Sequence, residues 1–173
     1  MPQTEKFPAG APMPVLSFPL LGGGTAAIGG ERARWTLLIV YRGRHCPKCK
    51  TYLGKLERLA ADWDAAGFDI LTVSGDPEEK AAADVAEFGW TFPVAHSMSE
   101  EQMRALGLYV SDPLSEAETD RRFPEPGLFC IRPDGRAQVI AISNAPGARP
   151  DLGDLLAGMV YTLETGRPPR GTA

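Results

Sequence analysis

The chain has 173 residues, of which 43% are hydrophobic and 23% charged, as is typical of one compact domain with a substantial core. Its 18 lysines and arginines against 22 acidic residues give a formal net charge of -4. It therefore lacks the excess of positive charge that binds nucleic acids and anionic membranes, and we expect neither nucleic acid nor membrane as a partner.

No export signal is recognisable at the start, where residues 1–6 mix acidic and basic side chains and lead into proline-rich sequence. A signal peptide would need a basic start and a continuous apolar stretch. The longest apolar run, residues 35–41, is far too short to cross a bilayer and has the length of a buried strand. We therefore expect a soluble, cytoplasmic protein.

The first elements in chain order are an arm, a hairpin and a strand. Residues 1–14 are rich in proline, glycine and alanine without periodicity, which predicts an extended N-terminal arm. A short strand over 15–21 is followed by three glycines that predict a hairpin loop. Residues 36–41 are apolar throughout, as in a central strand that helices cover on both faces.

A helix is predicted to start at Pro47, because proline suits the first helical position, and to end at Gly67. Its apolar residues recur at helical spacing and form one stripe: Leu53, Leu56, Leu59, Ala60 and Trp63. Residues 68–74 predict a second strand. A parallel, right-handed crossover is the default for such a βαβ unit.

The rest of the chain continues the alternation. Asp76 is predicted to cap a helix that runs to about Phe88. Polar sequence over 111–126 predicts a mobile surface loop. The remaining predicted elements are an edge strand at 92–95, a helix from 99 to 106, a hairpin over 127–142 and a final helix capped by Asp151.

This order predicts an α/β fold, in which helices flank a central mixed β-sheet preceded by an N-terminal hairpin. We place one domain at 15–165, between the arm at 1–14 and a C-terminal tail at 166–173. The seam between the first long strand and the first long helix is where open α/β sheets place their ligand sites.

Two of the three cysteines, Cys46 and Cys49, lie at that seam. Three cysteines are too few for a disulfide framework, and a close pair in a reducing compartment is more often catalytic or metal-binding than structural. Cys130 falls in an apolar, strand-like run, where a free cysteine usually behaves as a small buried hydrophobe. We favour that role for Cys130 over a role as a resolving thiol.

Cys46 is predicted to be the nucleophile, because the free N–H groups and the dipole at a helix N-terminus favour a thiolate. Cys49, one turn further on the same face, is predicted to resolve it in a reversible disulfide. Four nearby cations are expected to lower the pKa of Cys46 further: Arg42, Arg44, Lys48 and Lys50. His45 receives no catalytic role, because adjacent side chains normally diverge.

Two reactions are open to such a pair. The thiolate can attack a disulfide, or it can attack a hydroperoxide and form a sulfenic acid that Cys49 converts into a disulfide. Both reactions need an external thiol reductant of the thioredoxin or glutathione type. No segment resembles a flavin or nicotinamide site, so no cofactor is expected. A zinc site is disfavoured, because its only other ligands would be the badly placed His45 and the distant His96.

The pattern resembles the peroxiredoxin-like branch of the thioredoxin fold, whose members are described as redoxin or AhpC/TSA proteins. The similarity covers most of the chain: the strand before Cys46, residues 68–76, residues 92–94 with 101–109, and the hairpin around 132–135. The resemblance implies a thioredoxin-like fold and an antioxidant thiol peroxidase. Such domains often pair through sheet edges or loops, so the resemblance is compatible with a homodimer.

The resemblance breaks at the chemistry itself. Peroxiredoxins usually carry a proline seven residues, and a threonine or serine three residues, before the nucleophilic cysteine, and these positions are Ile39 and Gly43. The place of a second family arginine, or of the thioredoxin cis-proline, falls on Pro126. The resemblance implies that Pro126 packs beside the pair next to a free backbone edge that binds substrate. It also implies that Arg42, or Arg44, replaces the lost substrate-orienting groups.

Three functions remain open at this point. The leading hypothesis is hydroperoxide reduction through Cys46, with Cys49 as the resolving thiol. The Cys-Pro-x-Cys form resembles glutaredoxins and favours the first alternative, a thioredoxin-like disulfide oxidoreductase with little peroxidase activity. The second alternative is a non-enzymatic redox sensor in which the 111–126 segment changes a partner interface.

Overall fold

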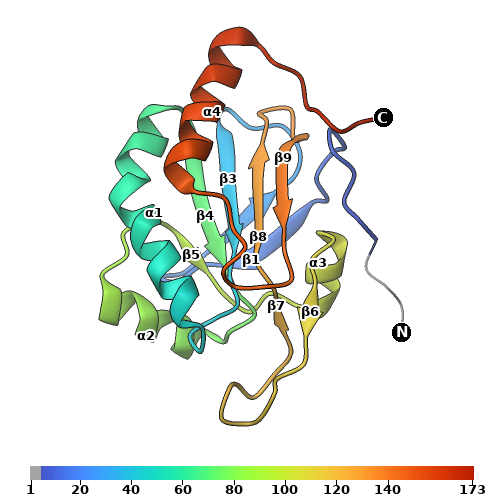
Figure 1. The fold of residues 1–173 in the computed structure, drawn as a ribbon. Helices are drawn as coiled ribbons and strands as arrows, with labels where there is room; N and C mark the ends of the chain where they lie inside the picture. Colours follow the sequence, from blue (N-terminus) through green and yellow to red (C-terminus); the bar gives the residue numbers. More distant parts are fainter. Residues whose placement is uncertain (1–4) are drawn as a thin grey trace.

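A five-stranded mixed sheet forms the centre of the computed structural model, which describes residues 5–173. Its strands are β3 (Trp35–Val40), β4 (Phe68–Val73), β5 (Val94–Ala95), β8 (Gly127–Ile131) and β9 (Ala137–Ile142). Their order is β5-β4-β3-β8-β9; β3, β4 and β5 run parallel, and β8 is antiparallel to both β3 and β9 (Figure 1). The predicted mixed sheet, parallel βαβ unit and hairpin over 127–142 are confirmed.

Helices flank this sheet, as predicted. They are α1 (Pro47–Ala65), α2 (Glu78–Phe88), α3 (Glu100–Ala105) and α4 (Leu152–Thr165). Two small hairpins complete the described chain: β1 (Leu16–Pro19) with β2 (Thr25–Ile28), and β6 (Val110–Ser111) with β7 (Phe123–Pro124). No helix of the described residues is long and apolar enough to cross a membrane.

The central strand β3 divides the core into two layers. Leu37, Ile39 and the following Tyr41 face a cluster that includes residues of α1 and α4. Leu38 and Val40 face a second cluster, which includes residues of the β1–β2 hairpin and of α3. Burial on both faces explains the unbroken apolar run of this strand.

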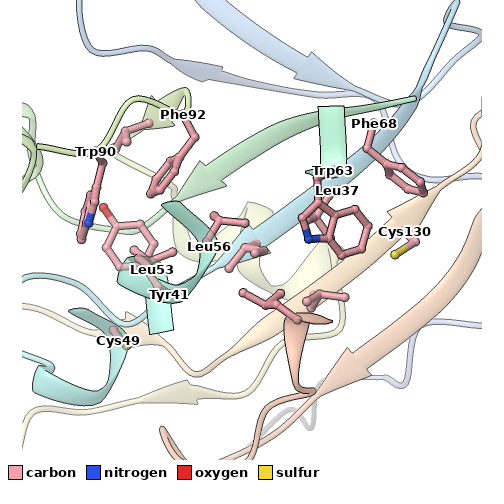
Figure 2. Close-up of a cluster of buried hydrophobic side chains, with 14 of the residues drawn as sticks. Leu37, Tyr41, Cys49, Leu53, Leu56, Trp63, Phe68, Trp90, Phe92 and Cys130 are labelled. Carbon is pink, nitrogen blue, oxygen red and sulfur yellow. The ribbon is translucent and has the colours of Figure 1, made fainter. Parts of the chain in front are cut away.

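Helix α1 is fixed to the sheet by one face. Leu53, Leu56 and Trp63 on that face are fully buried, and Figure 2 shows Trp63 beside Leu37 of β3 and Leu53 beside Tyr41. Full burial of one such side chain stabilises a fold by about 1.5–3 kcal/mol, so this face holds the helix firmly. Cys49 belongs to the same buried face. The first turn of α1, which carries both cysteines, is therefore anchored in the core.

The described part of the N-terminal arm packs along the β8–β9 hairpin. The Gly10 N–H donates to the Ala137 carbonyl at 2.9 Å, and the Met13 N–H donates to the Gly135 carbonyl at 2.8 Å. Residues 1–4 of the predicted arm lie outside the described residues. The segment predicted as a loop over 111–126 starts with the end of β6 and contains β7, and its last four residues are buried.

Candidate functional site

The loop between β3 and α1 carries the site, and a carboxylate holds it in place. The Arg44 backbone N–H donates to Asp76 Oδ2 at 2.7 Å. Gly43 has a φ of 130°, and a Cβ at this position would lie 2.7 Å from the same oxygen. The position therefore requires glycine. The prediction that Asp76 caps α2 is wrong: Pro77 is the N-cap residue there and makes no side-chain cap, while Asp76 binds the loop before Cys46.

Cys46 is itself the N-cap residue of α1, and its sulfur takes the role that an oxygen usually has. Its Sγ accepts a hydrogen bond from the Cys49 backbone N–H at 3.3 Å. The Cys49 thiol and that N–H both lower the pKa of Cys46, and the Arg42 guanidinium and the charge of Arg149 add to them. These interactions outweigh burial and bring the pKa of Cys46 to about 5. Cys46 is thus a thiolate near neutral pH.

Cys49 has the opposite character. Burial in the core raises its pKa above the ordinary value, and the hydrogen bond to Cys46 raises it further. Arg149 opposes both effects, because its Nη2 donates to the Cys49 Sγ at 2.6 Å. The pair therefore consists of one ionised and one protonated thiol, and the roles of nucleophile and resolving thiol stay predictions. Both sulfurs are free, and both residues are only about 1% exposed.

Of the four cations expected around Cys46, Arg42 is the one that meets it. Its guanidinium also lies 3.0 Å from Glu125 and 4.7 Å from the centre of the Phe123 ring. Arg44 instead pairs with Asp84 at 2.6 Å and with Glu87 at 2.9 Å. It therefore neutralises acids of α2, and its expected contribution to the pKa of Cys46 is corrected.

The two lysines of the expected basic cluster are also directed elsewhere. The Lys50 ammonium lies 5.5 Å from the centre of the Phe88 ring. Lys48 lines a cleft of about 360 Å³ between the start of α1 and the loop before α4. This cleft is also lined by Tyr52, Lys55 and Arg149, and its volume lies within the range of small-molecule sites.

Sequence reasoning did not identify Arg149 as part of the site. It lies in the loop between β9 and α4, far from the cysteines in sequence. Its guanidinium lies 4.9 Å from the centre of the Tyr52 ring, and the Tyr52 hydroxyl donates to the Pro150 carbonyl at 2.7 Å. The nearest signal in the sequence was Tyr52 itself, three residues after Cys49, but nothing local linked it to a cation.

His45 is a half-buried ring beside the thiols. It packs edge-on against Phe123 at 4.6 Å, and neither ring nitrogen has a hydrogen-bond partner among the described residues. Burial lowers the pKa of His45, and the nearby charge of Arg42 lowers it further. The ring is therefore neutral near pH 7 and forms no imidazolium–thiolate pair, in agreement with the absence of a catalytic assignment.

Pro126 is buried, with both adjoining backbone groups in use. The Glu125 N–H donates to the Tyr109 carbonyl at 2.8 Å, and the Pro126 carbonyl accepts from the Ser143 N–H at 3.1 Å. Both of these groups are bonded within the chain, so neither offers the free edge expected beside Pro126. The Glu125–Pro126 peptide bond is trans, unlike that of the thioredoxin proline. Pro126 and Arg149 line the same small cavity of about 10 Å³.

Cys130 lies in the middle of β8 and is fully buried, as a small hydrophobe would be. Burial raises the pKa of its thiol, so it remains protonated. Among residues 5–173, no three or more His, Cys, Asp or Glu side chains come together in a way that could hold a metal ion.

A thiolate at the start of the helix that follows the central strand, with a second thiol one turn further on, defines the chain as a thiol-dependent oxidoreductase of the thioredoxin fold. Residues 9–140 match the model of the AhpC/TSA family. The chain therefore belongs to this family, as the resemblance implied.

Known proteins agree with this assignment. A Mycobacterium tuberculosis protein that carries the name of a peroxiredoxin is 25% identical over 109 residues, which is 63% of this chain and 69% of that protein. The fold is similar to that of a peroxiredoxin-like protein from Aquifex aeolicus, with a TM-score of 0.76 at 17% identity over 92% and 89% of the two chains. It is also similar to AhpC of M. tuberculosis, with a TM-score of 0.73 at 15% identity over 94% and 96%.

Proposed function

We propose that this enzyme reduces hydroperoxides through Cys46 and resolves the product with Cys49. The Cys46 thiolate attacks the terminal peroxide oxygen, so the O–O bond breaks and the alcohol leaves after taking a proton. The sulfenic acid then reacts with the Cys49 thiol, which forms the S–S bond and releases water. Two external thiol groups return the pair to its reduced form and become a disulfide themselves.

The observation that carries the proposal is the position of the Cys46 sulfur at the N-cap of α1. There it accepts the Cys49 N–H, and its pKa falls to about 5. A thiolate is the reactive form in both peroxide and disulfide chemistry. The resolving thiol lies one turn away on the same helix, so the disulfide closes with little movement of the backbone.

The reductase alternative is favoured by the missing peroxide-orienting groups. Gly43 offers no hydroxyl and Ile39 replaces the family proline. Arg42 is our candidate for the group that orients the peroxide, because its guanidinium meets Cys46. A substrate-binding role for Pro126 also stays a prediction. A sensor function would use the same disulfide to change a partner surface at 111–126.

Stopped-flow oxidation by hydrogen peroxide tests the peroxidase function. We expect a second-order rate constant far above that of the thiolate of free cysteine, because the site must orient the peroxide as well as ionise the sulfur. A rate no faster than that of free cysteine would remove the peroxidase reading. The Cys49→Ser variant then separates the alternatives: an exchange enzyme traps mixed disulfides with many proteins, whereas a sensor traps one.

The reductant that we propose is a thiol of the thioredoxin or glutathione type, reacting in the cytoplasm. The cleft beside α1 supports an anionic reductant, because Lys48, Lys55 and Arg149 line it and Asp151 is its one acidic residue. A homodimer is part of the proposal only by analogy with the family. Sedimentation of the reduced and oxidised protein measures its assembly, and fractionation of cells measures its compartment.

A further inference from the structure

Arg149 is a cation without a carboxylate partner among the described residues. Its two buried nitrogens Nε and Nη1 donate to no group among the described residues, and its Nη2 donates to the Cys49 sulfur at 2.6 Å. A charge removed from water is costly unless an anion or aromatic face compensates it. The Tyr52 ring at 4.9 Å supplies part of this compensation. The nearby Cys46 thiolate supplies a further part through its charge, but the hydrogen bond of the guanidinium goes to the protonated Cys49.

The position of Arg149 is built by the same helix that carries the thiols. Tyr52 follows Cys49 by three residues and therefore lies on the same side of α1. Its ring packs against the guanidinium, and its hydroxyl holds the backbone directly after Arg149 through the Pro150 carbonyl at 2.7 Å. The side chain and the backbone of this arginine are thus both fixed relative to Cys49.

We propose that Arg149 is a catalytic residue of the resolving thiol, which stabilises the Cys49 thiolate each time the Cys46–Cys49 disulfide forms or breaks. The proposal rests on the proposed disulfide cycle. During formation, Cys49 loses its proton to water and attacks the Cys46 sulfur; the S–O bond breaks, and the departing hydroxide takes up a proton. During reduction, an external thiolate attacks Cys46, and Cys49 leaves as a thiolate beside the guanidinium.

This role differs from that of the arginine at Cys46. Arg42 shares its charge between Cys46 and the acids Glu125 and Glu118. Arg149 forms no ion pair among the described residues and donates its hydrogen bond to the buried Cys49 sulfur, where a low dielectric strengthens the attraction. A leaving thiol of lower pKa departs faster. Arg149 therefore speeds the departure of Cys49 when an external thiolate attacks the Cys46 sulfur.

The first test needs no peroxide. A chemical oxidant such as diamide forms the disulfide in a Cys130→Ser background, and dithiothreitol then reduces it under single-turnover conditions. We expect Arg149→Met to slow reduction about tenfold, as a change of one to two pH units in the pKa of the leaving thiol would do. Arg149→Lys should recover part of the loss, because it restores the charge but not the planar fork.

Arg132→Met is the matched control. Its guanidinium also lies over an aromatic ring, 5.5 Å from the centre of Trp35, but on a different part of the sheet. It should leave the reduction rate unchanged. A rate for Arg149→Met within twofold of the parent protein, or no recovery with lysine, would overturn the proposal. Failure of the parent protein to form the disulfide would overturn both this role and the proposed cycle.

The second test separates this role from the peroxidase function. Rapid quenching and mass spectrometry follow the two steps after one equivalent of peroxide. Arg149→Met should slow disulfide formation about tenfold while changing the first oxidation of Cys46 much less. Equal slowing of both steps would show that Arg149 acts mainly on Cys46 and would overturn its proposed role at Cys49. A parent protein that fails to react with peroxide, but still shows the arginine effect on reduction, would reject only the peroxidase function.

Tyr52→Phe covers the case in which Arg149→Met fails to fold. It keeps the ring under the guanidinium but removes the hydrogen bond to the Pro150 carbonyl. We expect a smaller slowing of the same two steps, about threefold, because the arginine is less well fixed. Thermal unfolding of each variant confirms that the rates belong to folded protein. Where Arg149→Met does not fold, an unchanged rate in folded Tyr52→Phe would reject the role.

Discussion

The two sulfurs lie one helical turn apart and meet different surroundings. Cys46 accepts a hydrogen bond at the start of the helix and shares Arg42 with Glu125, whereas Cys49 lies in the core and accepts its hydrogen bond from Arg149. The first is ionised and the second protonated as a result. The start of helix α1 determines the surroundings of Cys46, and the distant loop before α4 determines those of Cys49. The local sequence therefore informs only about Cys46.

Removing either sulfur should give the largest effect and the clearest distinction between the two. Cys46→Ser should abolish reaction with peroxide, because Cys49 and Cys130 are both buried and protonated. Cys49→Ser should still form a sulfenic acid at Cys46 but no internal disulfide. Mass spectrometry after mild peroxide measures both products. Cys130→Ser is the control and should match the parent protein; peroxide-dependent loss of thiol in Cys46→Ser would contradict the assignment.

A serine at position 43 would restore the hydroxyl that peroxiredoxins usually carry three residues before the cysteine, but it would destabilise the loop between β3 and α1. Gly43→Ser places a Cβ 2.7 Å from Asp76 Oδ2 at a φ of 130°. We expect a loss of about 1–3 kcal/mol in the free energy of unfolding, measured by urea denaturation. Gly54→Ser is the control in a helix with open space at that Cβ, and it should lose less. Equal stability of Gly43→Ser and the parent would show that the loop relaxes freely.

The pH dependence follows from the ionised state of Cys46. Its pKa of about 5 lies below the ordinary value of 9.0, so the reactive thiolate is present above pH 5 and is lost as the pH falls through that value. Alkylation of Cys46 in a Cys49→Ser, Cys130→Ser protein should fall about tenfold for each pH unit below the pKa. Because the Cys49 thiol is the largest cause of the low pKa, serine there should shift the midpoint to higher pH. A midpoint near 9 in the protein that retains Cys49 would contradict the structure.

The sequence sufficed for the fold because each element has a local cause. The apolar run of β3, the proline at the start of α1 and the apolar stripe of that helix each depend on neighbours in sequence, and the structure bears them out. Asp76 misled because a carboxylate before a proline resembles a cap, while its partner is the Arg44 N–H on another loop. An aspartate before a proline has the same local sequence whether it caps the following helix or binds the backbone of another loop.

The site was predictable in the same measure. The thiols were found because their spacing is local, and Cys130 because its strand is apolar. The cation of Cys49 was missed because Arg149 reaches it across 100 residues of chain. In the resemblance, the place of a second family arginine or of the thioredoxin cis-proline falls on Pro126, and the structure brings Arg149 from the loop between β9 and α4 into a cavity that both residues line. A contact between side chains that lie far apart in the sequence produces no spacing motif from which it could be predicted.

The smallest expected effect is on the pKa of Cys46, and it comes from the competition of the Glu125 carboxylate for the Arg42 guanidinium. Glu125 is buried, accepts from the Ser111 hydroxyl at 2.8 Å and lies 3.0 Å from the Arg42 guanidinium. Arg42→Met should raise the pKa of Cys46, because a hydrogen bond to the thiolate is lost. Glu125→Gln should lower it, because the shared positive charge is released toward the sulfur. Each change should alter the thiolate-to-thiol ratio at the midpoint pH about threefold, a shift of about half a pH unit.

Opposite signs are the decisive feature of that pair of variants. They are measured by the pH midpoint of Cys46 alkylation, with Arg44→Met as the matched control, because that arginine is bound to Asp84 and Glu87 instead. If Glu125→Gln raises the midpoint as Arg42→Met does, the carboxylate positions the arginine more than it neutralises it. The two arginines would then differ in how they are held: Glu125 would position Arg42, whereas the Tyr52 ring and the loop before α4 position Arg149.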